Sequence, residues 1–200
     1  GVPHMRRATD SAAPGRGLIP PYGGRLPNLL VGDPARRDEL KSVAATARAL
    51  VLSERSQCEL ELLATGGFAP LEGFLGQADA ERVLDEMRLA DGTLWPMPVT
   101  LPVPESIPTG TVLALRDAER ELLAVLTVTE CFPLDPEREA TALWGSLAAE
   151  HPLHAELVAR GRFRVAGRLE VLRRPVPGAS ARLRLTPAET RERLEALGAE

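Results

Sequence analysis

The chain has 200 residues, of which 44% are hydrophobic and 26% are charged, a composition typical of one globular domain with a short extension. The formal net charge of −4 means that the chain has no excess of positive charge to attract nucleic acid or an anionic membrane surface, so neither is favoured as a partner. Two cysteines cannot build a disulfide framework, which favours a reducing compartment and a cytoplasmic location. No hydrophobic run approaches the ~20 residues that a membrane-spanning helix requires.

The first 17 residues are expected to lie outside the folded domain. Residues 1–5 are interpreted as a cloning scar that ends in a start Met. Residues 6–17 form a polar segment rich in Gly, Ala and Pro. We therefore expect a flexible tail over 1–17 and a folded domain over 18–174.

Helical patterns dominate the first part of this domain. A short helix is expected over 35–47, and a brief strand over 50–52. Ser53 is a favourable N-cap for a second helix over 54–65, and the glycine pair that follows is typical of a helix end. The apolar face of this second helix is expected to carry Cys58, Leu62 and Leu63.

A third helix is expected after an apolar loop from Gly67 to Leu75, which holds two of the four phenylalanines. Asp79 is the expected N-cap of this helix. The Asp91-Gly92 pair beyond it indicates a turn. The inward-facing residues of the helix are expected to be Val83, Leu84 and Met87.

The pattern changes to strands after Trp95. Prolines at positions 98 and 102 place the segment 97–103 at a sheet edge or at a bulge. The elements expected next, in order, are a strand over 110–116, a hairpin loop over 117–120, a strand over 121–129, helices over 136–144 and 151–160, and a strand over 163–172. The residues alone therefore predict an α+β domain with a β-rich centre.

The last residues are expected to form a linker and one more helix. Residues 173–180 have the composition of a linker. Thr186 is a suitable N-cap for the helix, and a proline and a glutamate stand at the favoured first-turn positions after it. Leu194 and Leu197 form the short apolar face of this helix, and that face has no evident partner within the chain.

Motifs for catalysis or ligand binding are weak. The glycines at 66, 67 and 73 lack the lysine of a phosphate-binding loop, and they follow a helix instead of a strand. His151 and His154 have the spacing of an HxxH pair, which could stabilise a transferring nucleotidyl group. A structural position at the start of a helix, with His154 on its surface, is the favoured interpretation, because no third metal ligand is evident nearby.

Other reactive or aromatic residues are assigned structural roles. Cys58 and Cys131 are expected to be small core residues, and Trp95 and Trp144 are expected to be packing anchors and not stacking platforms. Two groups of acids are interpreted as helix-start charges and solvated faces: Asp79, Glu81 and Asp85, and Asp135, Glu137 and Glu139. The sequence therefore indicates no catalytic, cofactor-binding or metal-binding residue, and no cofactor.

Several segments occur in an order that resembles one enzyme family. Residues 19–26 are similar to a Pro-His-Gly-Gly-x-Leu opening, with Tyr22 in place of the histidine. Residues 66–75 are similar to a Gly-x-Phe-Ser-Pro-Leu-x-Gly-Phe-Met segment, and residues 87–101 give the most specific match. Three short similarities follow in order: Glu139-Ala140, Trp144-Gly145-Ser146 and His151-Pro152. In these features the chain resembles the ATP sulfurylases (sulfate adenylyltransferases).

The resemblance implies a PUA-like β-barrel decorated with helices, which is the non-catalytic N-terminal domain of that family. The catalytic nucleotidyltransferase domain of the family carries a signature that resembles Gln-Thr-Arg-Asn-Pro-x-His-Arg-Ala-His, and this sequence lacks it. His151 and His154 correspond to a different segment, so no catalytic residue is carried over. Residues 175–200 are then expected to be a linker and a first helix that lead toward the catalytic domain.

The resemblance also implies a parent reaction, in which ATP and sulfate give adenylylsulfate (APS) and pyrophosphate, and this chain alone is expected to be inactive in it. Several alternatives stay open. The chain could be a free-standing PUA-like module that binds RNA or protein, although its acidic balance and few aromatics disfavour RNA. Two further possibilities are that the parent is bifunctional and carries an APS kinase domain, and that the protein forms a homo-oligomer. The loop from Gly67 to Leu75, with Phe68 and Phe74 expected to be exposed, would suit an interface.

Overall fold

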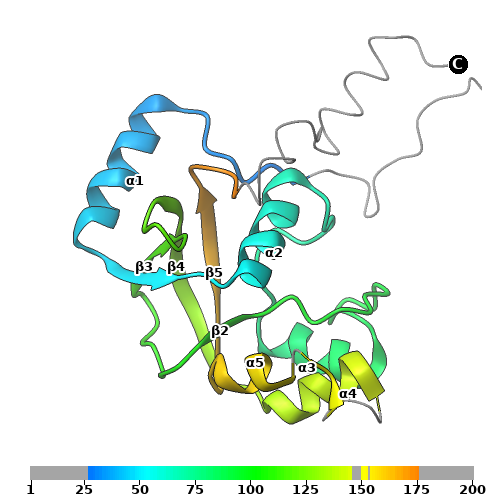
Figure 1. Ribbon diagram of the computed structural model, residues 1–200. Coiled ribbons are helices and arrows are strands. Elements are labelled where there is room, and N and C mark those ends of the chain that lie inside the picture. The colour runs from blue at the N-terminus through cyan, green and yellow to red at the C-terminus, as the bar shows by residue number, and fades with distance from the viewer. Residues whose placement is uncertain (1–26, 146–149, 153, 176–200) are drawn as a thin grey trace, which may run out of the picture.

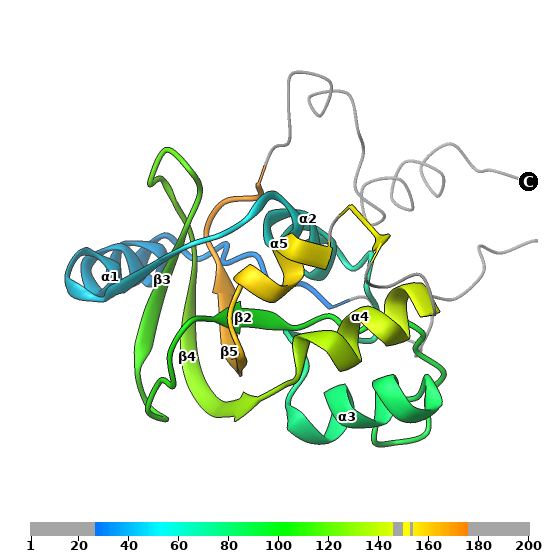
Figure 2. The ribbon, with the colours of Figure 1, turned by 60° about the horizontal axis from the view of Figure 1, so that its bottom comes forward.

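The computed structural model describes residues 27–145, 150–152 and 154–175. A five-stranded mixed sheet curls into a half-barrel, with helices packed on both of its faces and at one end (Figures 1 and 2). This arrangement confirms the expected α+β class. The expected tail over 1–17, the opening motif over 19–26 and most of the expected linker and last helix lie outside the described residues.

The sheet combines one parallel and three antiparallel pairings, in the order β1-β3-β4-β5-β2. Its strands are β1 (Arg48–Val51), β2 (Leu101–Val103), β3 (Val112–Arg116), β4 (Leu122–Pro133) and β5 (Phe163–Val171). β2 lies at a sheet edge, which confirms the expectation from its prolines, because a proline lacks the N–H group that a central strand needs for its ladder. β3 and β4 form the expected hairpin.

Five helices flank this sheet: α1 (Pro34–Thr46), α2 (Glu54–Thr65), α3 (Gln77–Glu86), α4 (Pro136–Trp144) and α5 (His154–Ala159). The start and the end of α2 confirm the capping residues expected from the sequence. The hydroxyl of Ser53 accepts a hydrogen bond from the backbone of Ser56, and Gly66 ends the helix in the left-handed region at φ 80°. Asp135 caps α4 in the same way.

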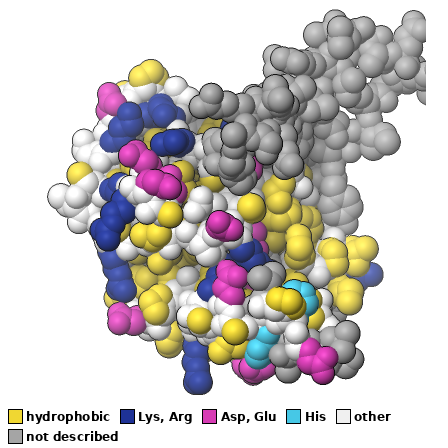
Figure 3. All heavy atoms as spheres, in the orientation of Figure 1, with side chains coloured by type: hydrophobic (Ala, Val, Ile, Leu, Met, Phe, Trp, Pro, Cys, Tyr) yellow, Lys and Arg dark blue, Asp and Glu magenta, His cyan; other side chains and the backbone are white. Residues whose placement is uncertain are grey.

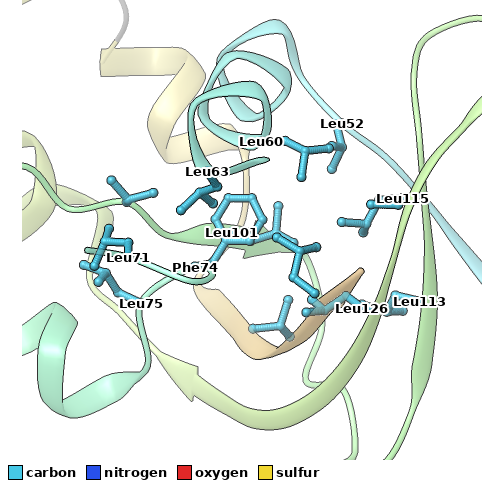
Figure 4. Packing of buried hydrophobic residues seen from close by; sticks show 14 of the residues in the cluster. Leu52, Leu60, Leu63, Leu71, Phe74, Leu75, Leu101, Leu113, Leu115 and Leu126 are labelled. Carbon is cyan, nitrogen blue, oxygen red and sulfur yellow. The ribbon is translucent and has the colours of Figure 1, made fainter. Parts of the chain in front are cut away.

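Alternation along the strands divides the core into two parts. Leu113 and Leu115 of β3 face the interior of the half-barrel, where they meet residues of α2 such as Leu60 (Figure 4). Ala114, between those two leucines, faces the opposite side of the sheet and packs against α1. Successive side chains of a strand point to opposite faces, so one strand serves both parts.

The buried face of α2 differs from the expected one. Leu63 is buried, but Cys58 and Leu62 are exposed. The buried positions instead follow a stripe with helical spacing that includes polar residues: Ser56, Glu59, Leu60, Leu63 and Ala64. The expected face was wrong because apolar character alone misses a helix face that buries a serine and a glutamate.

The expected cap and one expected core residue of α3 were also wrong. The helix begins after Gly76, and Asp79 lies in its first turn, where its carboxylate accepts a hydrogen bond from the backbone of Ala90 at 2.7 Å. Val83 is buried as expected, but Met87 is 56% exposed. Met87 follows the last helical residue and adopts a left-handed conformation, so its side chain leaves the helical stripe.

The loop from Gly67 to Leu75 is part of the core. Phe68 and Phe74 are 8% and 5% exposed, so the expectation that they are exposed was wrong. Phe68 packs edge-to-face on Trp95, with ring centroids 5.8 Å apart. Figure 4 shows Phe74 among leucines from α2 and the sheet. The two phenylalanines therefore attach the loop to the domain instead of forming an external surface.

Candidate functional site

A cluster of polar side chains lies buried where α2, α4 and β5 meet, next to the turn that follows α5. It is the densest group of buried charges in the described part of the chain. We call it the inner polar cluster, and it comprises Arg55, Ser56, Glu59, Thr100, Glu139, Arg160 and Arg164.

The centre of the inner polar cluster is an ion pair between α4 and β5. The guanidinium of Arg164 is 2.7 Å from a carboxylate oxygen of Glu139, and the two residues are 0% and 2% exposed. Arg164 also donates to the hydroxyl of Thr100 at 3.2 Å and to the carbonyl of Gly161 at 2.6 Å. This pair satisfies the requirement that a buried charge has both a counter-charge and hydrogen bonds.

Glu139 was wrongly expected on a solvated helix face. The sequence carried one signal for its role, because Glu139-Ala140 begins one of the three short similarities to the ATP sulfurylases. Arg164, its partner, was not singled out. The helical pattern of 136–144 does not say which of its acids turns inward, since that depends on β5, which begins only at residue 163.

Glu59 of α2 is the second buried acid of the inner polar cluster. Its side chain accepts a hydrogen bond from Arg55, with a distance of 3.2 Å between Nε and Oε1. The other oxygen, Oε2, is buried and has no hydrogen-bond partner. Burial raises the pKa of Glu59 to about 7, against the opposing charge of Arg55.

Arg160 follows α5 and lines two pockets. A pocket of about 330 Å³ lies between the edge strands β1 and β2, and it is bordered by Leu50, Ser53, Ser56, Leu101, Pro102 and Arg160. A second pocket, of about 280 Å³, lies on the other side of Arg160, beside Arg55 and Cys58. The guanidinium donates a hydrogen bond to the hydroxyl of Ser56. Burial lowers the pKa of Arg160.

The two expected histidines have separate partners. His154 Nε2 lies 2.8 Å from a carboxylate oxygen of Glu137, and His151 stacks on the ring of Trp144 at 4.0 Å. Trp144 also packs beside Leu157, in accordance with its expected role as an anchor. Within the described residues, no group of three or more His, Cys, Asp or Glu side chains could hold a metal ion.

The two cysteines lie outside the innermost core. Cys58 was expected to be a core residue, but its side chain is exposed. Loss of part of its hydration, together with the nearby acids Glu61, Glu54 and Glu59, raises the pKa of its thiol. Cys131 is partly buried, and its sulfur accepts a hydrogen bond from the backbone of Ile107 at 3.3 Å.

Comparison with known proteins identifies the fold. A family model described as a PUA-like domain matches residues 19–174. The chain belongs to the PUA-like domain family. The curled sheet with flanking helices is thus the PUA-like fold that the resemblance implied.

The relatives of this PUA-like domain are sulfate adenylyltransferases. The chain is 42% identical to that of Mycosarcoma maydis, over 86% of the chain and 31% of the relative. It is 39% identical to that of Synechococcus sp. (strain JA-3-3Ab), over 87% of the chain and 45% of the relative. The chain thus spans about a third to under a half of the length of these relatives.

A solved structure resembles this PUA-like domain closely. It is described as a hexameric APS kinase from Thiobacillus denitrificans, and it is superimposed with a TM-score of 0.69 at 34% sequence identity. The match covers 90% of this chain and 32% of that chain. This chain is therefore similar both to curated sequences and to part of a longer protein of known structure.

Charges of both signs are interspersed on the face of the PUA-like domain seen in Figure 3. Several of them form ion pairs with each other, such as Arg36 with Glu170 at 2.9 Å. Arg36 lowers the pKa of Glu170 through this hydrogen-bonded pair. Of the helices in the described ranges, none is long and apolar enough to span a membrane.

Proposed function

We propose that this PUA-like domain is the non-catalytic N-terminal domain of a sulfate adenylyltransferase. The reaction of the parent would join ATP and sulfate to give adenylylsulfate and pyrophosphate. The observation that carries the proposal is the similarity to sulfate adenylyltransferases, at 42% identity over 86% of this chain. The order of the motifs in the sequence supports the same assignment.

The chemistry of the inner polar cluster supports a structural role for the domain. Both of its carboxylates and two of its three arginines are directed at each other: Arg164 binds Glu139, and Arg55 binds Glu59. A site for sulfate and ATP would instead need basic groups turned toward a ligand, since both substrates are anions. The proposal therefore assigns catalysis to another part of the parent and no catalytic, cofactor or metal ligand to this chain.

The proposed domain covers 18–174, and the family match over residues 19–174 supports these limits. Residues 175–200 would be a linker and a first helix toward a nucleotidyltransferase domain, which is the proposed partner. A cytoplasmic location is part of the proposal, and the two unpaired cysteines of the chain are consistent with a reducing compartment. Assembly into a homo-oligomer is a further proposal, supported by the hexameric description of the structural relative.

A bifunctional parent is a second candidate. The structural relative is described as an APS kinase, and this chain matches 32% of it at 34% identity. An APS kinase consumes the product of a sulfate adenylyltransferase, so the two activities form a chemical sequence. The natural reading frame after Glu200 tests this candidate directly, since it would have to encode both a nucleotidyltransferase and a nucleotide kinase domain.

The isolated chain should release no pyrophosphate from ATP and sulfate. The measurement is a coupled pyrophosphate assay with the purified 200-residue chain, and a complete sulfate adenylyltransferase serves as the positive control. Turnover that follows the chain through purification would contradict a non-catalytic role.

A domain exchange tests the positive part of the proposal. Residues 19–174 would replace the matching segment in the Synechococcus sulfate adenylyltransferase, which is 39% identical. We expect the hybrid to fold and to release pyrophosphate, whereas the same enzyme with the segment deleted should not. A folded hybrid without activity would contradict the assignment, and so would salt-sensitive binding of mixed RNA by the isolated chain, which would favour a free-standing module.

A further inference from the structure

An acidic and a basic side chain of the inner polar cluster, Glu59 and Arg160, lie beside each other without forming an ion pair. Glu59 has a buried carboxyl oxygen, Oε2, that accepts no hydrogen bond. Arg160 donates to Ser56, and among the described residues it has no ion-pair partner. A guanidinium carries five N–H donors, so the bond to Ser56 leaves donors available.

The spacing on α2 brings these two groups together. Ser56 and Glu59 are three residues apart, and both belong to the buried face of the helix. Side chains at this spacing are neighbours on one helix face. The guanidinium that is bound to Ser56 therefore lies next to the carboxyl group of Glu59, and the charge of each group acts on the other.

The charged groups around Glu59 come from each element that packs on it. Arg55 on α2 binds Oε1, and Arg160 approaches from the end of α5. Glu139 on α4 is the nearby like charge, and it is held by Arg164 of β5. Arg55 and Arg164 are thus already engaged with carboxylates, whereas Arg160 is engaged only with a neutral hydroxyl.

We propose that Glu59 and Arg160 form a pH-controlled switch between α2 and the end of α5. In one state, the carboxyl of Glu59 is protonated and Arg160 stays on the hydroxyl of Ser56, which is the contact that the structure shows. In the other state, Glu59 has released its proton to solvent, and the guanidinium moves from Ser56 onto Oε2. The exchange replaces a hydrogen bond to a neutral group by a charge-assisted bond.

The switch connects the charge of one buried group to the surface. Arg160 borders both the pocket between β1 and β2 and the pocket beside Cys58. Movement of its guanidinium from Ser56 toward Glu59 withdraws the side chain from the first pocket. The pH that titrates Glu59 lies near neutrality, because burial raises its pKa to about 7.

The test is a pH titration of the full chain by NMR, with the carboxyl carbon of Glu59 and the Nε–H group of Arg160 as probes. We expect both signals to move with one common midpoint between about pH 5 and 8. In Glu59→Gln, the Arg160 signal should no longer titrate. The matched control is Glu61→Gln, which removes a carboxylate two positions away on α2 and should leave the common midpoint in place.

A second variant tests the hydroxyl side of the switch. Ser56→Ala removes the group that holds Arg160 when Glu59 is protonated, so it should lower the midpoint of Glu59 by about one pH unit. A Glu59 signal that titrates near its ordinary value would overturn the proposal. An Arg160 signal that stays constant while Glu59 titrates, or that still titrates in Glu59→Gln, would overturn it as well.

Discussion

At the scale of single residues, the notable feature of this domain is that it buries charges in pairs. Arg164 and Glu139 are almost completely shielded from solvent and connect β5 to α4. Desolvation of two charges costs about as much as their attraction returns, so such a pair adds little net stability. Removal of one partner should destabilise the fold strongly, because the remaining charge is left buried and unpaired.

Arg164→Met should therefore destabilise the domain by about 3–5 kcal/mol. The double variant Arg164→Met, Glu139→Leu should recover most of that loss, because no charge remains buried. Urea denaturation of the two single variants and the double variant gives the coupling energy. Additive losses would show that the pair does not act as a unit.

The pH dependence of stability should contain a contribution from Glu59. Its pKa is raised from 4.5 to about 7 in the folded chain, so the folded state holds a proton that the unfolded state has already released. The resulting stabilisation is complete below about pH 4.5 and is lost as the pH rises to about 7, with a total of about 3 kcal/mol. The Glu59→Gln variant should lack this fall, so the difference in stability between the original chain and the variant should change between about pH 4.5 and 7. Parallel profiles for the two proteins would contradict the raised pKa.

At the scale of elements, β4 and β5 make the longest pairing of the sheet, and it contains an irregularity between Val128 and Glu130. Gly167 of β5 lies opposite Val128 at this point. A Cβ atom on Gly167 would overlap the backbone carbonyl of Thr127 and approach the backbone nitrogen of Thr129 to 2.9 Å. The close approach of the two strands thus depends on the absence of a side chain at this position.

Gly167→Ala should consequently lower the melting temperature strongly, because backbone atoms on both strands would have to shift. The matched control is Gly32→Ala, since a Cβ there meets no atom within 4 Å and the residue has no positive φ. Thermal denaturation followed by circular dichroism compares the two. Similar melting temperatures for both variants would argue against the close packing of β4 on β5.

At the scale of the whole molecule, the sheet separates a large core from a small one. The large core lies inside the half-barrel with α2 and the loop from Gly67 to Leu75. The small core lies under α1 and includes Leu40, Ala44, Ala114, Val125 and Leu172. β5 lies between β4 and β2 in the sheet, and the chain that leaves it supplies Leu172 to the small core.

Two truncations should therefore have different effects. A chain that begins at Arg48 loses α1, and with it Leu40 and Ala44 of the small core, but keeps every strand, so it should fold with a lower melting temperature. A chain that ends at Gly161 loses β5 and leaves β2 without its neighbour, so it should show no cooperative unfolding. Calorimetry distinguishes the two results. Cooperative unfolding of the chain without β5 would contradict the central place of that strand.

The sequence by itself determined most local features. Hydrophobic patterns and caps placed the described helices and strands within a few residues, because Ser53, Gly66 and the prolines near β2 act through the backbone next to them. The order of short motifs along the chain also indicated the PUA-like family, since each motif is a local run of residues that can be compared without knowledge of its contacts.

Only the tertiary structure decided which side chains are buried and what they contact. Cys58 and Leu62 were expected to be buried and are exposed, whereas Phe68 and Phe74 were expected to be exposed and are buried. Sequence patterns missed this because burial depends on elements that are distant in the chain. The inner polar cluster shows the same limit more strongly. Glu139 and Glu59 are acids on helices, and no hydrophobic pattern along the chain marks them as buried. Their burial follows from packing against β5 and the end of α5, which supply Arg164 and Arg160 from distant positions along the chain.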